Sequence, residues 1–330
     1  MAELFGRRVA SVGTRVAVPV LVAASALAIT PGVAGAAVSN GAIAYLRPGP
    51  AGGQDIWTIN PDGTGARRLI ADADRLRYSP GGDRILFVRT VNAVPRLVLA
   101  NPDGTARKSV AGTWTSGDWS PDGTRLVTTA QVGGHSELFV RPVAAGVATQ
   151  LTHQGDQGCE ARDPDWGPRG LVFVTYCPRS TFPVAISGKV EIHLAQLPAR
   201  RLVDDSALVS RVSNFVLETS NQFVRQPRWN ASGEILFTGC IWPPVVSRCN
   251  GAARYNVFKV TTAGVVAPLS HVPDDQADTG YTHAVPAPTG RTFVVSANLP
   301  QQKGIQVFTT PRLTLDPLGQ AVQDWQPLGA

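Results

Sequence analysis

Short apolar runs separated by polar turns recur along residues 40–330, and this pattern predicts β-strands. In the clearest example, Trp119-Ser120-Pro121-Asp122-Gly123 leads into the apolar run Leu126-Val127-Thr128. Proline presets φ and glycine readily takes positive φ, so the Pro-Asp-Gly stretch predicts a hairpin between two strands. Runs that favour helix are few, and we expect an all-β fold.

This unit, an aromatic residue followed by a turn, occurs six times, once with valine in place of the aromatic residue. The six anchor positions lie 41, 47, 63, 56 and 40 residues apart and are Tyr78, Trp119, Trp166, Trp229, Val285 and Trp325. A strand follows each of the first five anchors, a third strand such as Leu138-Phe139-Val140 recurs six times, and a weaker fourth strand ends each unit. Four strands per unit of roughly 45 residues is the period of a propeller blade.

The sixth anchor has no strand after it, because the sequence ends at Ala330. The matching apolar strand, residues 41–46, stands alone near the start of the repeats. We therefore predict that residues 322–325 supply the inner strand of one blade and residues 41–70 supply its outer three. This predicts a six-bladed β-propeller of four-stranded antiparallel blades, as a single domain at residues 37–330.

The repeat Trp-Ser-Pro-Asp-Gly, with an apolar strand and then an Ile-Trp-x-x-Asn-Pro-Asp-Gly segment, resembles the TolB-type repeat, also called PD40 or WD40-like. The resemblance covers roughly residues 40–330 and implies a six-bladed propeller that is secreted or periplasmic. The TolB family has a further α/β domain before its propeller, whereas here the repeats follow the leader directly. The repeat also resembles the propeller of prolyl-oligopeptidase-like enzymes, but we expect no hydrolase domain here.

Residues 1–36 have the features of a signal peptide. Three arginines precede an apolar run of 14 residues, Val16 to Ile29, and Ala34-Gly35-Ala36 is an A-x-A cleavage site. The run is shorter than the roughly 20 residues that span a bilayer. We expect export to the extracellular space or the cell envelope, with no membrane span after cleavage; the alternative is an uncleaved anchor.

The formal charge of +6 changes this picture little, because the basic residues are spread along the chain. No basic run is long enough to argue for nucleic acid as a partner. The sequence has no G-x-S-x-G and no H-E-x-x-H motif, so no catalytic residue is predicted. We expect a monomer.

Four cysteines in an exported chain predict two disulfides. Cys159 and Cys177 each lie nine residues from Pro168, so they stand opposite each other in one hairpin. Cys240 and Cys249 close a short loop, and the spacings lack the C-x-x-C pattern typical of zinc. We predict the pairs Cys159–Cys177 and Cys240–Cys249.

Turns alternate between the two faces of a propeller built from meanders. The Pro-Asp-Gly turns fall on one face, here called the turn face. The irregular connections fall on the other, here called the long-loop face, at residues 47–54, 153–162, 178–189, 204–224, 240–254 and 271–282. Long loops on a rigid scaffold commonly carry function, although they can equally mark a place where insertions are tolerated.

Our first hypothesis is therefore a non-catalytic binding module for a protein, peptide or glycan. The contacts predicted from loop position and chemistry are Trp242, Arg248, Tyr176, Arg179, Phe182, Glu160, Arg162, Arg225 and Tyr281. Five tryptophans at repeat positions are expected to pack between blades, namely Trp57, Trp119, Trp166, Trp229 and Trp325. The two tryptophans outside the repeat, Trp114 and Trp242, are candidates for a contact surface.

The alternative is a metal-dependent propeller enzyme of the lactonase or lyase type. It requires oxygen ligands that converge at the central channel, where calcium would bind. Glu160, Asn221 and Asp278 are the residues that could converge there. Otherwise no cofactor is predicted.

Overall fold

Antiparallel strands make up nearly all regular structure in the computed structural model of the protein. It describes residues 39–50, 52–178, 188–195, 200–204, 224–241, 254–263, 265–272, 279–290, 292–309 and 313–328. The helix found in this part of the chain is one 3₁₀ turn, η1 (Gln154–Gln157). The prediction of an all-β fold is confirmed. Residues 36–330 form one unit by their contacts, and the predicted leader, residues 1–36, lies outside the described residues.

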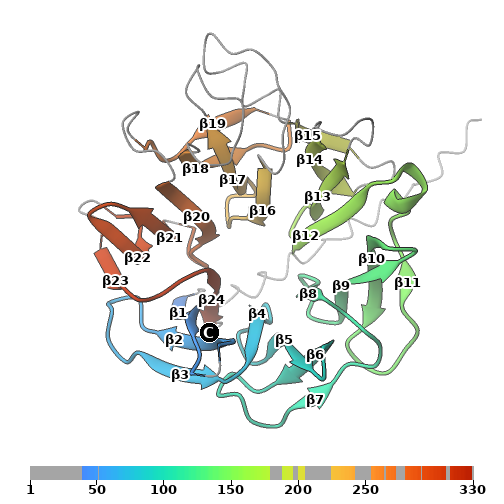
Figure 1. The fold of residues 1–330 in the computed structure, drawn as a ribbon, viewed down its shortest axis with the longest axis horizontal. Helices are drawn as coiled ribbons and strands as arrows, with labels where there is room; N and C mark the ends of the chain where they lie inside the picture. The colour runs from blue at the N-terminus through green and yellow to red at the C-terminus, as the bar shows by residue number, and fades with distance from the viewer. Residues whose placement is uncertain are drawn as a thin grey trace, which may run out of the picture. The chain divides into compact units, whose positions relative to one another are not determined.

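Three sheets are four-stranded meanders in chain order (Figure 1). The first contains β4 (Ala73–Tyr78), β5 (Ile85–Val91), β6 (Val94–Ala100) and β7 (Lys108–Ser109). The second contains β8 (Ser116–Trp119), β9 (Arg125–Val132), β10 (His135–Pro142) and β11 (Thr149–Gln150). The third contains β12 (Glu160–Gly167), β13 (Gly170–Pro178), β14 (Gly188–Ala195) and β15 (Arg200–Asp204).

Two further meanders share one larger sheet. They are β16 (Val224–Trp229), β17 (Ile235–Ile241), β18 (Arg254–Val260) and β19 (Val266–Pro268), then β20 (Thr279–Pro286), β21 (Phe293–Leu299), β22 (Gln302–Val307) and β23 (Leu313–Asp316). They are joined where β18 and β20 pair in parallel over two residues each, Arg254 with Thr279 and Tyr255 with Gly280.

The last sheet joins residues from the two ends of the repeat region. Its order is β24-β1-β2-β3, with β24 (Val322–Leu328), β1 (Ser39–Pro48), β2 (Gln54–Ile59) and β3 (Arg67–Ile70). Strand β24 runs antiparallel to β1, with Trp325 opposite Ile43 and Asp324 opposite Ala44. This is the pairing expected from the unmatched strand near residue 41.

The first strand of each meander lies nearest a common centre (Figure 1). These inner strands are in contact in the cyclic order β24, β4, β8, β12, β16, β20 and back to β24. Side chains at the same repeat position of different sheets therefore meet around one axis.

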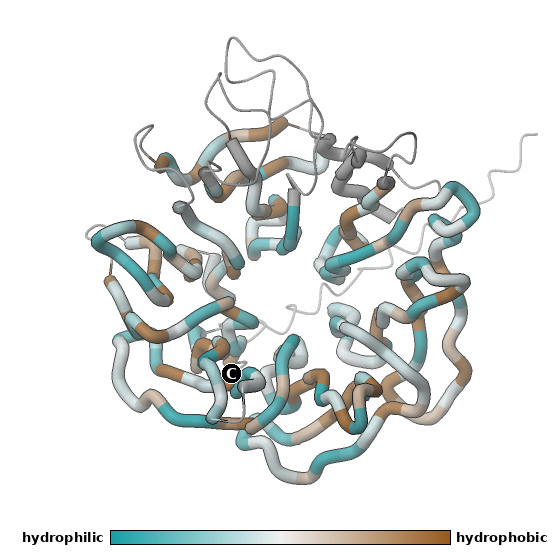
Figure 2. The backbone as a smooth tube through the Cα atoms, in the orientation of Figure 1, coloured by the Kyte–Doolittle hydropathy of each residue, from teal (hydrophilic) through white to brown (hydrophobic). Residues whose placement is uncertain are grey.

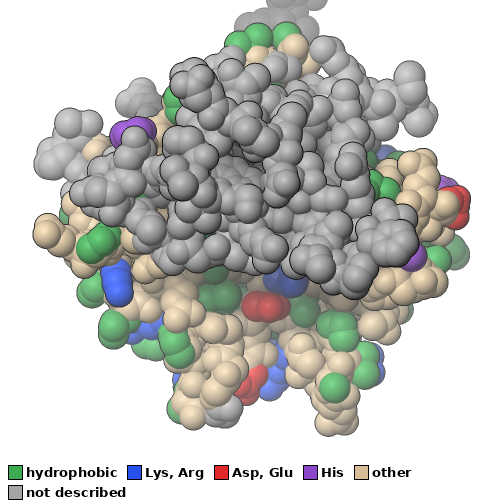
Figure 3. Space-filling model, turned by 45° about the horizontal axis from the view of Figure 1, so that its top comes forward, with side chains coloured by type: hydrophobic (Ala, Val, Ile, Leu, Met, Phe, Trp, Pro, Cys, Tyr) green, Lys and Arg blue, Asp and Glu red, His purple; other side chains and the backbone are tan. Residues whose placement is uncertain are grey.

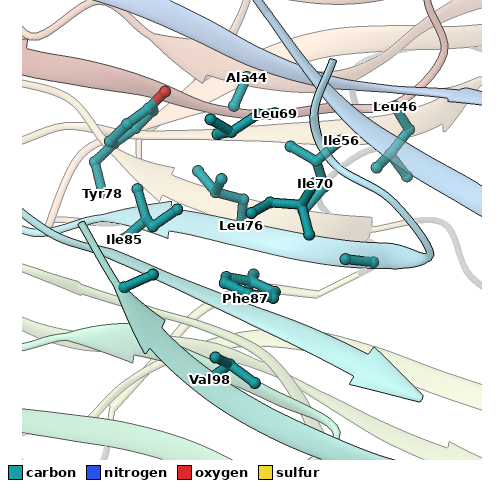
Figure 4. Packing of buried hydrophobic residues seen from close by; sticks show 12 residues of the cluster. Ala44, Leu46, Ile56, Leu69, Ile70, Leu76, Tyr78, Ile85, Phe87 and Val98 are labelled. Atoms are coloured by element: carbon teal, nitrogen blue, oxygen red, sulfur yellow. The ribbon is translucent and has the colours of Figure 1, made fainter. Parts of the chain in front are cut away.

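The strands are apolar on both faces because each sheet is packed between two others. On β1, Ile43 and Tyr45 pack toward β20–β23, whereas Ala44 and Leu46 pack toward β4–β7. Successive residues of a strand point to opposite faces, so two adjacent buried residues serve two different cores. Figure 4 shows the core between the β24-β1-β2-β3 sheet and the β4–β7 sheet, where Ile56 and Ile70 approach Leu76 and Phe87. Hydrophobic stretches recur in the described sheets around the ring (Figure 2).

The Pro-Asp-Gly turns are built as the sequence predicts. Gly123 has φ of 67° and donates its N–H to Ser120 O, and Ser120 donates to Arg125 O. The Asp122 carboxylate accepts hydrogen bonds from the Ser120 and Thr124 hydroxyls, which lower its pKa to about 2. The turn is thus satisfied by its own side chains.

The fifth anchor is Pro286, and its prediction at Val285 was wrong by one residue. Pro286 pairs with Phe293 as Trp119 pairs with Leu126, and Ala287 makes the turn hydrogen bonds that Ser120 makes. Hydrophobicity favoured the valine as the match to an aromatic residue. The turn geometry places the proline there instead.

The tryptophans divide differently from the prediction. Trp119, Trp229 and Trp325 are buried as expected. Trp57 and Trp166 also pack against the cores between sheets, but they are partly exposed, and Arg47 and Arg125 lie 4.2 and 4.9 Å from the centres of their rings. The prediction that Trp114 forms a contact surface was wrong.

Trp114 is only 8% exposed, packs edge-on against Phe139 and donates its indole N–H to Ala111 O. It fills the core between two sheets because the connection that carries it folds back over them. Within the described residues, no helix has the length and apolar character needed to cross a membrane.

Candidate binding site

Four of the contacts predicted from the sequence line one cavity of about 550 Å³, here called the rim cavity. These four are Glu160, Arg162, Tyr176 and Arg225. The remaining lining residues are Arg75, Thr115, Ser116, Thr129, Gln131, Ser136, Asp163, Val174 and Gln226. The cavity lies where β8, β12 and β16 begin, at the opposite end of the inner strands from the Pro-Asp-Gly turns. The structure therefore brings together side chains as far apart in the sequence as Arg75 and Gln226.

A disulfide fixes the hairpin on one wall of the rim cavity. Cys159 and Cys177 are bonded, with their Cα atoms 4.1 Å apart, which confirms this predicted pair. The adjacent residues Glu160 and Tyr176 stand opposite each other in the β12–β13 ladder. A crosslink over a loop of this length contributes about 3 kcal/mol to the free energy of unfolding. It also holds two cavity-lining strand ends at a fixed separation.

The Arg162 guanidinium is held in place on this wall. Its Nε and Nη2 atoms lie 2.7 and 2.6 Å from Glu160 Oε2, and its carbon lies 4.6 Å from the centre of the Tyr176 ring. The planar group is thus fixed at its edge by a carboxylate and on one face by an aromatic ring. These contacts hold the Arg162 guanidinium in one orientation at the cavity wall.

The opposite wall, here called the hydroxyl wall, consists of hydroxyl and amide groups from β8, β9 and β10. Ser116 Oγ donates to Thr129 Oγ1 at 2.8 Å, and Gln131 Nε2 donates to Ser136 Oγ at 2.6 Å. Because these side chains hold one another in place, the wall presents an ordered set of donors and acceptors.

Bulges on the inner strands shape the mouth of the channel. Arg75, Asp163, Gln226 and His283 have φ between 49° and 55°, and the ladder shifts register at each of them. Gln226 donates its N–H to Asp163 Oδ2, and His283 donates its N–H to Gln226 Oε1, both at 3.2 Å. The bulges therefore turn side chains toward the centre and link successive sheets.

A second cavity of about 250 Å³, the channel cavity, lies along the axis and shares Arg75, Ser116, Asp163 and Gln226 with the rim cavity. Arg77 and Arg228 line its inner part. In the space-filling view, basic and acidic side chains lie close together on the described part of the surface (Figure 3). The described residues therefore form no large patch of one charge in that view.

Five charged residues surround the axis, each directly before an anchor, and are here called the charged ring: Arg77, Asp118, Asp165, Arg228 and Asp324. Asp118, Asp165 and Arg228 are buried, whereas Arg77 and Asp324 are partly exposed. Each aspartate accepts the backbone N–H of the anchor in the next sheet at 2.7 Å, the donors being Trp166, Trp229 and Tyr78 respectively. Arg228 binds Asp165 at 2.8 Å, and both arginines donate to Gln323 O. Arg228 stands where three of the other repeats have an aspartate facing the next sheet, and the anchor of that next sheet is Pro286, which has no N–H to donate.

Burial sets the protonation of this ring. Desolvation, and then repulsion from Asp165, raise the pKa of Asp118 to about 7, and desolvation also raises the pKa of Asp324. Desolvation lowers the pKa of the nearby His283 to about 4, so that imidazole is neutral near pH 7.

We predict that Asp118 makes stability fall as pH rises. Its pKa of about 7 in the folded state lies above its ordinary value of 3.8, so the folded state binds more protons than the unfolded state between these values, and the stability that this provides is lost as pH rises through 7. Asp118→Asn keeps an oxygen acceptor for Trp166 and removes the titration. From pH 4 to pH 8 the wild type should therefore lose stability relative to the variant. The difference in the free energy of unfolding, variant minus wild type, should increase by a few kcal/mol, at about 1.4 kcal/mol per pKa unit.

Chemical denaturation at each pH measures this difference. His283 contributes the opposite slope, because its lowered pKa costs stability as pH falls from 6.5 through about 4. That contribution is the same in both proteins and cancels. A difference that stays constant from pH 4 to pH 8 would contradict the assignment to Asp118.

The prediction that Tyr281 is a surface contact was wrong. It lies within β20, is 1% exposed and packs edge-on against Phe308 at 5.2 Å between ring centres. The strand begins before it, at Thr279, so Tyr281 is part of the core and not of the preceding loop.

Several predicted positions lie outside the residues whose side chains the structure describes, and their roles stay predictions. They are Trp242, Arg248, Arg179, Phe182, Asn221, Asp278, Cys240 and Cys249. The described residues include no group of three or more His, Cys, Asp or Glu side chains placed to hold a metal ion. Glu160, the described member of the proposed calcium set, is paired with Arg162.

Sequence reasoning missed the hydroxyl wall and the charged ring. A signal for the ring was present, since the residue before the anchor is charged in five of the six repeats. The wall had no comparable signal, because serine and threonine are ordinary at strand ends.

No protein-family model matches this chain, and no curated protein matches it. Solved structures do. TolB from Acinetobacter baumannii superposes with a TM-score of 0.57 at 16% identity over 87% of this chain and 66% of TolB. A putative TolB from Agrobacterium tumefaciens gives 0.56 at 16% identity over 87% of this chain and 93% of that one. The fold is that of a TolB-like β-propeller.

The propeller domain of the Trilobed protease from Pyrococcus furiosus is also similar, with a TM-score of 0.50 at 12% identity over 86% of this chain and 98% of that domain. That domain is described as having an open velcro topology. In the TolB-like propeller described here, β24 pairs with β1. At these identities the likeness shows the fold alone. This chain spans 66% of the A. baumannii protein, which is just under two thirds of its length.

Proposed function

We propose that the protein is an exported, non-catalytic binding module that holds a protein, peptide or glycan at the rim cavity. One observation carries the proposal. Glu160, Arg162, Tyr176 and Arg225, chosen from the sequence as contacts, converge on a single cavity beside the channel. A convergent set of polar groups in a preformed concave site is typical of ligand recognition.

We further propose that the scaffold is a closed six-bladed propeller. The cyclic contacts of the six inner strands and the division of the larger sheet at the β18–β20 pairing support six blades. The pairing of β24 with β1 supports closure. A closed ring gives the rim cavity rigid walls.

The leader-like residues 1–36 and the Cys159–Cys177 disulfide support export, because disulfides persist in oxidising compartments. The described residues that line the rim cavity include no histidine or cysteine, and Glu160 is already bonded to Arg162.

Capture of partners from the protein's own culture tests this function. Tyr176→Ala combined with Arg225→Gln should lower recovery of the partner at least tenfold, because buried tyrosine and arginine contacts are each worth about 2 kcal/mol or more in binding sites. The matched control is Arg96→Gln, which removes one exposed arginine from β6 outside the cavity. Trp242→Ala tests the predicted contact outside the described residues.

Circular dichroism and thermal melting should show that the double variant is folded. Equal recovery by the wild type and the folded double variant would contradict the proposal. So would an equal loss in the Arg96→Gln control, because the effect would then depend on charge alone.

A further inference from the structure

The rim cavity is polar on nearly every side. Of its thirteen described lining residues, only Val174 lacks a polar side-chain atom. A ligand that fills the cavity displaces water from these groups, and each group left without a partner opposes binding. The ligand must therefore offer polar groups in most directions.

The hydroxyl wall demands both donors and acceptors. A serine or threonine hydroxyl has one hydrogen to donate and two lone pairs, so the Ser116–Thr129 and Gln131–Ser136 bonds use only part of the capacity. A phosphate or sulfate only accepts hydrogen bonds. A peptide backbone offers one donor and one acceptor for each residue of about 3.3 Å. Each hydroxyl of a sugar both donates and accepts, and neighbouring hydroxyls are closer together than the donors and acceptors of a peptide backbone. Sugar hydroxyls therefore match the hydroxyl wall better than a peptide does.

The other wall adds guanidinium groups and one aromatic ring. Three guanidinium groups, those of Arg75, Arg162 and Arg225, line the cavity together with two carboxylates, those of Glu160 and Asp163. Arg75 also lies 3.8 Å from the carboxylate of Asp74, which lines the adjoining channel cavity. Guanidinium groups bind carboxylates with paired hydrogen bonds. Tyr176 supplies the apolar surface on which the C–H face of a sugar ring can pack.

The size of the site fits more than one sugar residue. Its volume of about 550 Å³ is within the usual range for small-ligand pockets of about 300–1,000 Å³, and it continues into the channel cavity through Arg75, Ser116, Asp163 and Gln226. We propose that the rim cavity binds an oligosaccharide that carries carboxylates, of the uronic-acid class. This inference rests on the proposed function and names the ligand of that same cavity.

Titration calorimetry on the exported protein tests it with tetragalacturonate as the probe. Two other probes are compared at equal concentration: maltotetraose, which has the hydroxyls without the carboxylates, and tetraglutamate, which has the carboxylates without the sugar. Tetragalacturonate should bind at least tenfold more tightly than either. Arg225→Gln should weaken it at least tenfold, Ser136→Ala with Gln131→Ala severalfold, and Arg96→Gln not measurably.

Equal or tighter binding of tetraglutamate would overturn the proposal in favour of an acidic peptide. Equal or tighter binding of maltotetraose would overturn the role of the carboxylate. If tetragalacturonate does not bind, while capture of the partner still depends on Tyr176 and Arg225, the saccharide proposal fails and the proposed function stands. If capture is also independent of these residues, both fail.

Discussion

A chain that stops at residue 321 is expected to lose its cooperative fold. The truncation removes β24, and with it the buried side chains of Val322 and Trp325 and the ladder that pairs β24 with β1. It also removes Asp324, which accepts the N–H of Tyr78, and Gln323 O, to which Arg77 and Arg228 donate. Burial of two such side chains alone is worth about 3–6 kcal/mol, comparable with the entire 5–15 kcal/mol of a typical domain.

A circular permutant is the matched control. Leu328 stands opposite Ser39 at the end of the β24–β1 ladder, so a short turn can join them and place residues 322–328 ahead of residue 39. This permutant should regain a single cooperative thermal transition, whereas the truncated chain should show none. A truncated chain that melts as cooperatively and as high as the full chain would show that β24 is dispensable.

Replacing Arg228 by methionine is expected to lower the free energy of unfolding by about 3–5 kcal/mol, the usual cost of removing one partner of a buried ion pair. Arg228 is 7% exposed, binds Asp165 at 2.8 Å and donates to Gln323 O at 2.5 Å. Its loss removes the donor to Asp165 Oδ1, while the Trp229 N–H still binds the other oxygen, Oδ2, of this buried carboxylate. Methionine keeps the length and the apolar contacts of the stem.

A double-mutant cycle separates the ion pair from the loss of packing. Asp165→Asn removes the charge and keeps an oxygen for Trp229, so the Arg228→Met, Asp165→Asn protein should be more stable than the sum of the two single effects predicts, by about 1–3 kcal/mol. The exposed Arg96→Met variant controls for charge and should change stability by less than about 0.5 kcal/mol. Strict additivity of the two buried changes would contradict direct coupling of Arg228 and Asp165.

The sheet order could be predicted because its determinants are local. Strand period, Pro-Asp-Gly turns and the unmatched strand at residues 41–46 together indicated that β24 pairs with β1. The anchor at Pro286 was missed because hydrophobicity does not detect a shift of one residue, whereas turn hydrogen bonds do. The bulges had no sequence signal, since Arg75, Asp163, Gln226 and His283 take positive φ without glycine.

The candidate site was predicted on one wall and missed on the other. Glu160 and Tyr176 could be placed together because one hairpin and its disulfide set their register. Ser116, Gln131 and Ser136 belong to the preceding sheet. Their distance from the β12–β13 hairpin depends on how the two sheets pack, and no local sequence pattern predicts that packing. Tyr281 was misplaced because the start of β20 was set too late in the sequence.

The most direct test of the central claim, that the rim cavity is the binding face, is site-specific photo-crosslinking in the protein's own culture. A photoreactive residue is placed at Gln131, exposed in the cavity wall at one end of the inner strands, or at Asp122, exposed in the Pro-Asp-Gly turn after β8. Both sites are solvent-accessible, so they differ chiefly in where they lie. The account predicts a crosslinked partner or glycan from Gln131 and none from Asp122. Crosslinks from Asp122 with none from Gln131 would contradict it.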